Sequence, residues 1–538
     1  MTHFIIKRLI QAQTTERTAD RTTHAPPHAR HTGRTAEPHM FGSLKNSHIP
    51  EGKKWKAEDV TVTEPATVRT AINAAAIGNV TEWYDFGVYG YLALTIEGVF
   101  LPEDSGAAGK IIVAGLFAVS FLVRPIGGLV FGPLSDRIGR NRVLAITMIM
   151  MATATFLIGV IPDYAAIGMA APFCLLLCRL LQGFSTGGEY SNAMTFISEY
   201  APDRKRGFFG SLLEVGTFGG YVLGATVAVV MESLLSDDQM QSWGWRLPFF
   251  VALPLGFIGI YLRTKLKDTP AFEAQEAAKS EPESESHAAR DFEGNEFKKI
   301  LSLWPSILVC CGLVIAWNVA NYMLTSYMPT YFDEVGDRQS GFEITNLTAN
   351  ILEIVVMAVC LLLIPVFGKL SDRIGRKPVL LAGCIGHIVL SIPAILLVRV
   401  DNIACVFIGL LMMGLSLICF SSMAPSTLPS LFPTVVRAGA LAIAFNVSIS
   451  LFCGTTSTIM SALISATGNL MWPAYWLMIA GVIGLISLRF LPESNGHPMW
   501  GSNPAAENEE EAIAHAEELN REIEEIEREA NSVKLGSR

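Results

Sequence analysis

The stretch GPLSDRIGRNRV, residues 132–143, returns in the second half of the chain as GKLSDRIGRKPV, residues 368–379. Each copy follows one long apolar run and precedes another. A basic, glycine-punctuated loop at equivalent places in two apolar halves indicates that one half-protein was duplicated into a pseudo-twofold whole. This organisation is typical of membrane transporters.

The composition is that of a protein that crosses a membrane many times. Hydrophobic residues make up 51% of the 538 residues and charged residues only 17%, and the charges gather in loops and tails. The apolar windows are long enough to cross about 30 Å of hydrocarbon as helices. The pattern predicts an all-α membrane protein with twelve transmembrane helices, at about 70–97, 108–132, 143–162, 171–198, 207–233, 246–263, 299–331, 347–368, 378–399, 402–430, 437–466 and 472–491.

The predicted spans divide six and six around a polar, Glu- and Ser-rich segment. Segments of this composition do not form a packed core. We therefore predict a disordered amino tail (1–68), an amino-terminal six-helix bundle (69–263), a linker (264–297), a carboxyl-terminal six-helix bundle (298–491) and a tail with a short heptad helix (492–538). Both Met1 and Met40 stay open as the start of translation.

Lys and Arg lie in the short loops on one side of the predicted spans. Because cytoplasmic loops carry the excess of these residues, the sequence predicts a cell-membrane protein with both termini in the cytoplasm. The nine cysteines lie within spans and show no metal-ligand spacing, and no hydrolase or nucleotide-binding motif is present. We expect no enzyme activity, no metal or other cofactor and no nucleic-acid partner.

The tail carries an apolar seam at heptad spacing. Its positions are Ala512, Ala516, Leu519, Ile523, Ile526, Ala530 and Val533. Three heptads with Ala at two a positions form a marginal coiled coil, so the seam allows either a solvated single helix or weak self-association.

The first predicted span contains GNVTEWYDFGVYG, residues 78–90. Helical spacing places Glu82, Asp85, Phe86 and Tyr89 on one face, with Trp83 to one side. A charge at the bilayer centre costs at least about 2.5–3.5 kcal/mol, so these carboxylates predict a site near partners or water. The alternative is an ion pair that only joins two helices.

We expect Asp85 to face Arg124 in the second span, because both lie near the middle of the membrane. Asp85 and Glu82 are then candidate proton carriers, and Glu189 and Glu214 are further candidates. Arg179 and Glu189 are about 15 Å apart along one helix, so each needs a partner elsewhere. Glu353 is predicted to lie near the outer interface in contact with solvent.

Several of these segments resemble one transporter family. GNVTEWYDFGVYG, FLVRPIGG, RLLQGFSTGGEY and EYAPDRKRGFFGS together are similar to the metabolite:H+ symporter family of the major facilitator superfamily. The two loops match the superfamily signature at Asp136, Arg137, Gly139 and Arg140 and at Asp372, Arg373, Gly375 and Arg376. The resemblance implies the major facilitator fold of two pseudo-symmetric six-helix bundles, with these loops controlling the motion between them.

The carboxyl half, with NVANYMLTSYMPTYF and NLMWPAYWLM, is most similar to the osmosensory proline/glycine-betaine:H+ symporters of that family. The resemblance implies H+-coupled uptake of zwitterionic compatible solutes, activated by high osmolality. It also implies that the tail tunes this activation.

The residue chemistry agrees with a zwitterion, because aromatic faces bind a quaternary ammonium and Arg binds a carboxylate. The candidate substrate-binding residues are Arg124, Trp83, Tyr84, Phe86, Tyr89, Asn318 and Tyr322. The alternative is H+ symport of a dicarboxylate or another organic acid, such as 2-oxoglutarate, citrate or shikimate. Further cations inside the carboxyl half would favour that alternative.

Overall fold

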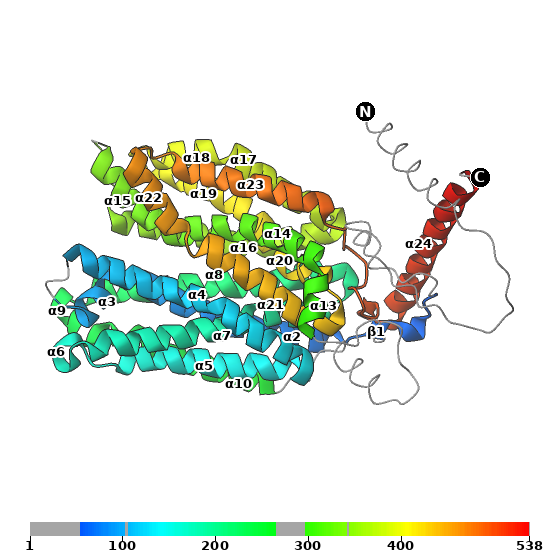
Figure 1. Cartoon of the computed structure of the whole chain (residues 1–538), viewed down its shortest axis with the longest axis horizontal. Helices are drawn as coiled ribbons and strands as arrows, with labels where there is room; N and C mark the ends of the chain where they lie inside the picture. The colour runs from blue at the N-terminus through cyan, green and yellow to red at the C-terminus, as the bar shows by residue number, and fades with distance from the viewer. Residues whose placement is uncertain (1–53, 103–105, 265–295, 340, 342–343, 537–538) are drawn as a thin grey trace, which may run out of the picture. The chain divides into compact units, whose positions relative to one another are not determined.

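The computed structural model describes residues 54–102, 106–264, 296–339, 341 and 344–536 (Figure 1). Most of the predicted amino tail, most of the linker, and Met1 and Met40 lie outside these residues. Each of the twelve predicted spans coincides with a helix or a run of helices. The helices of the amino half are α2 (Pro65–Tyr91), α3 (Ala93–Phe100), α4 (Gly106–Ile138), α5 (Arg140–Val160), α6 (Tyr164–Ile167), α7 (Ala170–Tyr200), α8 (Arg206–Leu234), α9 (Asp237–Gln239) and α10 (Arg246–Thr264).

The carboxyl half repeats this pattern with more breaks in its helices. Its elements are α13 (Glu296–Ser302), α14 (Trp304–Tyr322), α15 (Met328–Arg338), α16 (Asn346–Ile374), α17 (Arg376–Val389), α18 (Ser391–Val398), α19 (Ile403–Ser421), α20 (Ala424–Thr427), α21 (Arg437–Ser448), α22 (Thr456–Thr467) and α23 (Trp472–Phe490). π-helical turns over Met323–Tyr327 and Ile449–Cys453 join α14 to α15 and α21 to α22.

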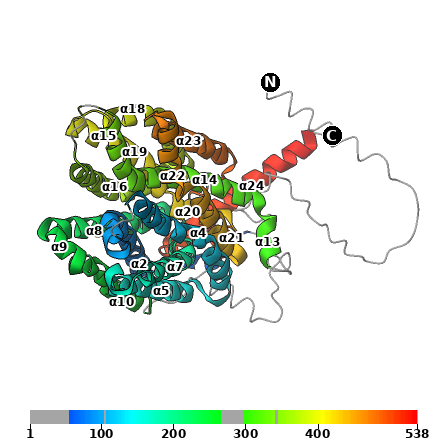
Figure 2. The ribbon, with the colours of Figure 1, turned by 60° about the vertical axis from the view of Figure 1, so that its left-hand side comes forward.

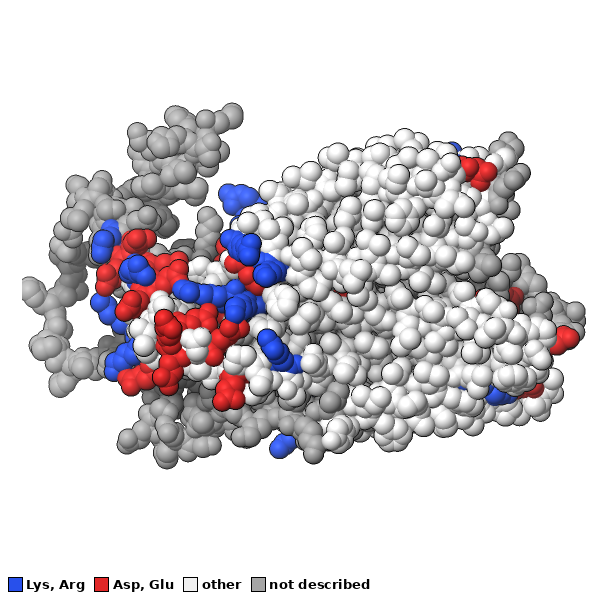
Figure 3. All heavy atoms as spheres, turned by 180° about the vertical axis from the view of Figure 1, so that it is seen from behind, with Lys and Arg blue, Asp and Glu red and all other residues white. Residues whose placement is uncertain are grey.

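Seven helices in the described part of the chain are long and apolar enough to cross a membrane. The bent pair α17 and α18, whose axes differ by 52°, would make an eighth. In Figure 3, Lys, Arg, Asp and Glu gather at one end of the molecule and a broad surface without charge adjoins them. Large apolar side chains such as Leu362, which is 71% exposed, lie on the surface of the bundle. Such a surface fits a lipid environment.

Glycines in α8 allow a close helix contact with α2 in the amino half. Gly216, Gly220 and Gly224 lie against backbone carbonyl groups of α2, and a Cβ atom at any of them would overlap those groups. Small residues let helix backbones approach where lipid provides no hydrophobic driving force. The glycines therefore serve packing rather than ligand contact.

The two halves meet along two symmetry-related helix pairs, α4 with α21 and α8 with α16 (Figure 2). At the end of α4, the Asp136 carboxylate accepts hydrogen bonds from the amide groups of Ala438 and Gly439, at 3.3 and 2.8 Å, in the first turn of α21. At the end of α16, Asp372 accepts from Gly207 and Phe208, both at 2.8 Å, in the first turn of α8. Each carboxylate thus satisfies helix amide groups that have no partner within their own helix.

The loops that follow these carboxylates depend on glycine. Gly139 and Gly375 have φ angles of +104° and +93°, a region that residues with a Cβ atom rarely adopt. The turn lets Arg140 enter the boundary between the halves, where it pairs with Glu199 at 3.4 Å. Glu199 also pairs with Arg437 of the other half at 2.7 Å.

The carboxyl tail forms α24 (Glu509–Gly536), which packs against residues just before α2. Strand β1 (Thr61–Val62) pairs in parallel with β2 (Ala505–Ala506), and Trp55 exchanges hydrogen bonds of 2.8 and 2.7 Å with Asn520. The apolar cluster between these segments contains Trp55, Val60, Ala506, Ala512, Ala516, Leu519 and Ile523. The first part of the heptad seam is therefore buried within the chain.

Two predictions about the termini are wrong. Residues 54–68 are ordered, because they supply the partner surface for α24 and the start of α2. The seam is neither a solvated helix nor a face used for self-association over residues 512–523, since Trp55 and Val60 cover it. The side chains of Ile526, Ala530 and Val533 lie outside the described part of the chain.

Ion pairs attach α24 to the loop between α7 and α8. Asp203 accepts hydrogen bonds from the amide of Ala505 at 3.0 Å and from His515 Nε2 at 3.1 Å, and it pairs with Arg206. Arg204 and Lys205 pair with Glu518 and Glu507. A further pair joins His497 Nε2 to Glu522 at 3.0 Å.

We predict that Asp136→Asn and Asp372→Asn each loosen a different helix start. A charge at a helix N-terminus contributes about 0.3–2 kcal/mol, so the amide groups that lose it should exchange hydrogen roughly 2- to 30-fold faster. Exchange measured in detergent should rise at residues 438–439 for Asp136→Asn and at residues 207–208 for Asp372→Asn. Each variant is the control for the other, and equal loosening at both helix starts would contradict the assignment.

We also predict that the contact between residue 497 and α24 weakens as pH rises. The hydrogen bond that charged His497 donates to Glu522 raises the pKa of His497 above its ordinary 6.5, and the same bond lowers the pKa of Glu522 below 4.5. The stabilisation is complete when His497 is charged, is lost as pH rises through the raised pKa of His497, and is lost on the acid side below the lowered pKa of Glu522.

The loss of a partly exposed ion pair costs about 1 kcal/mol or less. Tryptic cleavage after Arg521 should therefore accelerate less than about fivefold between pH 6 and 8. Glu522→Gln, digested in parallel, corrects for the pH dependence of the protease. A cleavage ratio between the two proteins that does not change with pH would refute the prediction.

Candidate functional site

Helix α2 presents buried polar side chains in two directions, into its own half and toward the other half. Glu82 and Asp85 are 1% and 0% exposed, and Arg124 on α4 is 2% exposed. Charged groups buried at this depth require partners. The side chains that point into the amino half and those that point toward the other half have different partners.

The inward direction is a closed network within the amino half. Asp85 Oδ2 pairs with Arg179 Nη1 of α7 at 3.1 Å, and both side chains are fully buried. The same Nη1 donates to Gln182 at 2.8 Å, and Gln182 donates to Thr155 of α5 at 2.9 Å. The Arg179 guanidinium lies 3.3 Å from the centre of the Tyr89 ring. This network joins α2, α5 and α7 by charge-assisted bonds.

The predicted pairing of Asp85 with Arg124 is therefore wrong. Arg179 lies on the inner side of α2 and neutralises Asp85 there. Two of the predicted substrate-binding aromatics also point inward: Tyr89 packs under Arg179, and the Tyr84 hydroxyl donates to the carbonyl of Pro248 at 2.8 Å. Helical spacing placed Asp85, Phe86 and Tyr89 on one face of α2, but the structure divides this face: Asp85 and Tyr89 contact Arg179 of α7, whereas Phe86 contacts Arg124 of α4.

The outward direction leads to Arg124, which lies among aromatic rings. Its guanidinium carbon is 4.9 Å from the centre of the Phe86 ring and 4.4 Å from that of Phe121. Its Nε and Nη2 atoms have no hydrogen-bond partner within the described residues. The Phe121 ring meets the Tyr322 ring of the carboxyl half edge to face at 5.2 Å. Arg124 thus combines unused donors with an aromatic wall at the boundary between the halves.

A second row of rings continues across this boundary. The Trp83 ring lies 5.6 Å from Phe86 and 6.4 Å from Tyr190 of α7. Tyr190 stacks on Phe445 of α21 at 5.1 Å and lies 6.0 Å from Trp317 of α14. Phe121, Tyr190 and Phe445 were not among the predicted site residues, although Tyr190 ends the RLLQGFSTGGEY segment.

A buried acid adjoins this second row. Glu214 of α8 accepts hydrogen bonds from Tyr190 and, at 3.2 Å, from Thr217, whose hydroxyl lies 2.5 Å from Asn79 of α2. A change in the side chain of Glu214 therefore affects Tyr190, whose ring contacts residues of both halves. Glu189 is 2% exposed, so the predicted carboxylates of the amino half are all buried.

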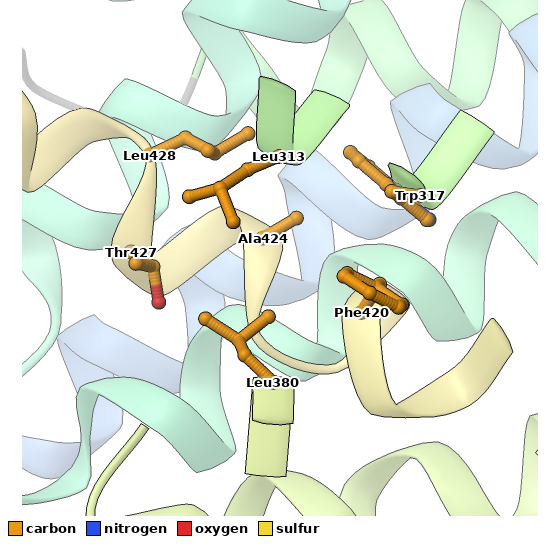
Figure 4. A pocket seen from close by; sticks show the side chains of 7 residues that line it. All are labelled: Leu313, Trp317, Leu380, Phe420, Ala424, Thr427 and Leu428. Atoms are coloured by element: carbon orange, nitrogen blue, oxygen red, sulfur yellow. The ribbon is translucent and has the colours of Figure 1, made fainter. Parts of the chain in front are cut away.

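Two features of the carboxyl half, the side chain of Asn318 and the cavity beside Trp317, do not fit direct binding of a solute. Asn318 donates to the carbonyl of Val314, one turn earlier in its own helix, at 3.3 Å. The cavity in Figure 4, beside Trp317, has room for about one water molecule, at about 10 Å³, and its lining is mainly apolar. It is too small for an organic solute.

The position predicted for Glu353 is also wrong. Its side chain is 1% exposed and lies 3.3 Å from the hydroxyl of Tyr221 on α8. The distance along α16 gave the depth of Glu353 but not its direction, and the residue faces the other half rather than solvent.

Comparison with known proteins agrees with this architecture. The profile of the family described as "Sugar (and other) transporter" matches residues 71–504. The chain belongs to this family of the major facilitator superfamily. It is a multi-pass membrane transporter and not an enzyme.

Two characterised relatives have closely similar sequences. The proline/betaine transporter of Escherichia coli K12 is 44% identical over 476 residues, which are 88% of this chain and 93% of the relative. The ectoine/proline transporter ProP of Corynebacterium glutamicum is 40% identical over 86% of this chain and 92% of its own length.

The fold is that of a major facilitator. The solved structure of the proton:xylose symporter XylE superimposes with a TM-score of 0.65 over 82% of this chain and 99% of that chain, at 18% identity. The predicted all-α membrane fold of the major facilitators is thereby confirmed.

We predict that Asp85→Asn strongly destabilises the amino half. Removal of one partner from a buried ion pair costs about 3–5 kcal/mol, because the Arg179 charge then remains in an apolar region. Thermal unfolding in detergent should occur at a clearly lower temperature. The double variant Asp85→Asn/Arg179→Gln should recover much of the loss, and a double variant no more stable than the single one would contradict the pairing.

Proposed function

We propose that this transporter takes up zwitterionic compatible solutes, such as proline and glycine betaine, together with H+. The single observation that carries the proposal is Arg124, whose guanidinium lies against the rings of Phe86 and Phe121 with donors that no described residue uses. The names of the relatives, which include proline, betaine and ectoine transporters, support the same substrate class.

The arrangement suits both ends of a zwitterion. The free Nε and Nη2 donors of Arg124 can hold a carboxylate in a bidentate contact. The rings of Trp83, Phe86 and Tyr322 can face an ammonium group, an interaction that contributes about 2 kcal/mol when water is excluded. Both contacts would form at the boundary between the halves, where substrate binding can affect their relative motion.

A dicarboxylate is the weaker candidate, because it requires a second cation. Arg179, the other fully buried arginine near this depth, is already neutralised by Asp85. The remaining fully buried arginines lie at helix ends beside the two repeated loops or the loops that contact them: Arg140, Arg206, Arg376 and Arg437.

Four buried carboxylates are candidates for the coupled proton: Asp85, Glu82, Glu189 and Glu214. Glu214 has the most direct connection to the other half, through Tyr190 and Phe445. Asp136 and Asp372, with Arg137, Gly139, Arg140, Arg373, Gly375 and Arg376, would set the rate of the motion between halves rather than substrate affinity.

The excess of Lys and Arg in these loops supports a cytoplasmic location for the repeated loops and both termini of a cell-membrane protein. The tail contacts the loop between α7 and α8 through two ion pairs, Arg204 with Glu518 of α24 and Lys205 with Glu507 just before α24. Ion pairs at the surface weaken as ionic strength rises. This supports a role of the tail in osmotic activation. Self-association through the last part of the seam remains a prediction.

Uptake into proteoliposomes tests the proposal. We expect radiolabelled proline or glycine betaine to accumulate when an inward pH gradient is imposed, and 2-oxoglutarate and shikimate not to do so. Accumulation of the acids in place of the zwitterions would reverse the choice of substrate class. Equal uptake with and without the gradient would remove H+ coupling.

Arg124→Lys tests the carboxylate contact. Replacement of a bidentate partner by a single ammonium should cost about 1.5–3 kcal/mol, which corresponds to a roughly 10- to 100-fold increase in KM. Arg246→Lys is the matched control, because Arg246 also lies over a ring, that of Trp245 at 4.4 Å, but donates to the carbonyls of Gly159 and Ile161. An unchanged KM in Arg124→Lys would exclude this site.

A further inference from the structure

Glu353 belongs to a polar contact between the halves that the proposed transport site does not include. The Tyr221 hydroxyl of α8 donates to the backbone carbonyl of Thr325, in the π-helical turn after α14, and lies 3.3 Å from Glu353 Oε1. Figures 1 and 2 show α8 beside α16, across the boundary of the halves. The Tyr91 ring packs edge to face against Tyr221 at 6.2 Å.

This contact lies away from the end of the molecule to which α24 is attached. Glu353 is seven residues from the start of α16 at Asn346, or about 10 Å along the helix, whereas Asp372 lies near its other end. The Tyr221 contact therefore joins α8 and α16 on the outer side, and the Asp372 contact joins the same helices on the cytoplasmic side.

The number of available protons determines how this contact can form. A tyrosine hydroxyl has one proton to donate, and the Thr325 carbonyl can only accept. When Tyr221 donates to Thr325, its oxygen can accept a hydrogen bond from Glu353 only if Glu353 carries a proton. An ionised Glu353 would compete with Thr325 for the single proton of Tyr221.

Charged partners that could hold an ionised Glu353 do not contact it within the described residues. On α8, Glu214 is bonded to Tyr190 and Glu232 is exposed. On α17, Arg376 binds Ser494 and His387 binds Ser416. Helix α19 contains no charged residue, and on α15 the side chain of Glu334 bonds to Tyr327 and Ser461.

Asp333 and Arg338 on α15 and Cys360 on α16 form no hydrogen bond or ion pair with Glu353 in the described structure. Tyr91 of α2, whose ring packs against Tyr221, also lies close to Glu353, but its hydroxyl has no hydrogen-bond partner within the described residues. An isolated ionised carboxylate in such surroundings costs several kcal/mol. Protonation removes this cost and completes the hydrogen-bond chain from Glu353 through Tyr221 to Thr325.

We propose that Glu353 is a positioning residue that takes up a proton from the outer water when α8 closes on α16 and returns it to that water when they separate. The step is a simple proton transfer between the Glu353 carboxylate and water. Glu353 therefore does not carry the transported proton but makes outer closure depend on outer pH. The effect of Glu353 on transport rests on the proposed function. The closure of α8 on α16 does not, because it can be measured without transport.

Distance measurement between spin labels tests the closure. One label at Leu234→Cys, at the end of α8, and one at Ile351→Cys, on α16, are introduced into a protein whose native cysteines are replaced; both positions are exposed. We expect the population with the short distance to fall as pH rises from 6 to 9, by up to about tenfold per pH unit above the midpoint.

Three variants separate the proposal from a merely structural role. Glu353→Gln, which can donate to Tyr221 without titrating, should keep the short distance at every pH. Tyr221→Phe should lose it at every pH. Glu232→Gln, an exposed carboxylate on the same helix, should behave like the parent protein. A pH response that persists in Glu353→Gln, or no response in the parent protein, would overturn the proposal.

Transport gives a second and separate readout. In Glu353→Gln, proline accumulation driven by a pH gradient should persist, while the dependence of proline exchange on outer pH should become weaker. Loss of accumulation in Glu353→Gln with a normal short distance would mean that Glu353 carries the coupled proton, which would overturn the role proposed here. Failure of the parent protein to accumulate proline would affect the proposed function and leave the distance experiment interpretable.

Discussion

The contact of a carboxylate with the free amide groups of a helix start in the opposite half is the constraint on which the structure depends. Asp136 meets the start of α21, and Asp372 meets the start of α8. Because the chain is a duplicated half, one contact implies its counterpart. Each contact satisfies groups that would otherwise be exposed or buried without a partner, and each can separate without loss of a helix. The halves are therefore joined by bonds that a rocking motion can break and remake.

The need to pair buried charges also explains the candidate site. A carboxylate at membrane depth needs a cation, and α2 places Asp85 against Arg179 within one half. Arg124 is not used in this pair, and its surroundings are rings rather than acids. A cation whose donors are unused and whose walls are aromatic favours a ligand with one carboxylate and one bulky cation. A second carboxylate on the ligand would have no counterpart.

The segments before α2 and after α23 add a contact that depends on both ends of the described chain. The seam of α24 is small and apolar at Ala512 and Ala516, so a flat ring such as that of Trp55 can lie against it. The same seam cannot be covered by Trp55 and by a second copy of the helix at once. Ion pairs to Arg204 and Lys205 then connect the tail to the loop directly before α8, the helix that contacts Asp372.

The sequence alone determined the all-helical membrane fold, the order of the helices, the duplication and the repeated loops, because each depends on local composition, spacing or repetition. It also singled out Arg124, Phe86, Trp83 and Tyr322 as candidate site residues from their types and depth, and their role in binding stays a prediction. Only the tertiary structure decided that Asp85 faces Arg179, that Glu353 faces Tyr221, and that Trp55 covers the heptad seam. Helical periodicity fixes which residues share a face, but the neighbour of that face is set by the packing of helices distant in the chain, and local spacing carries no information about that packing.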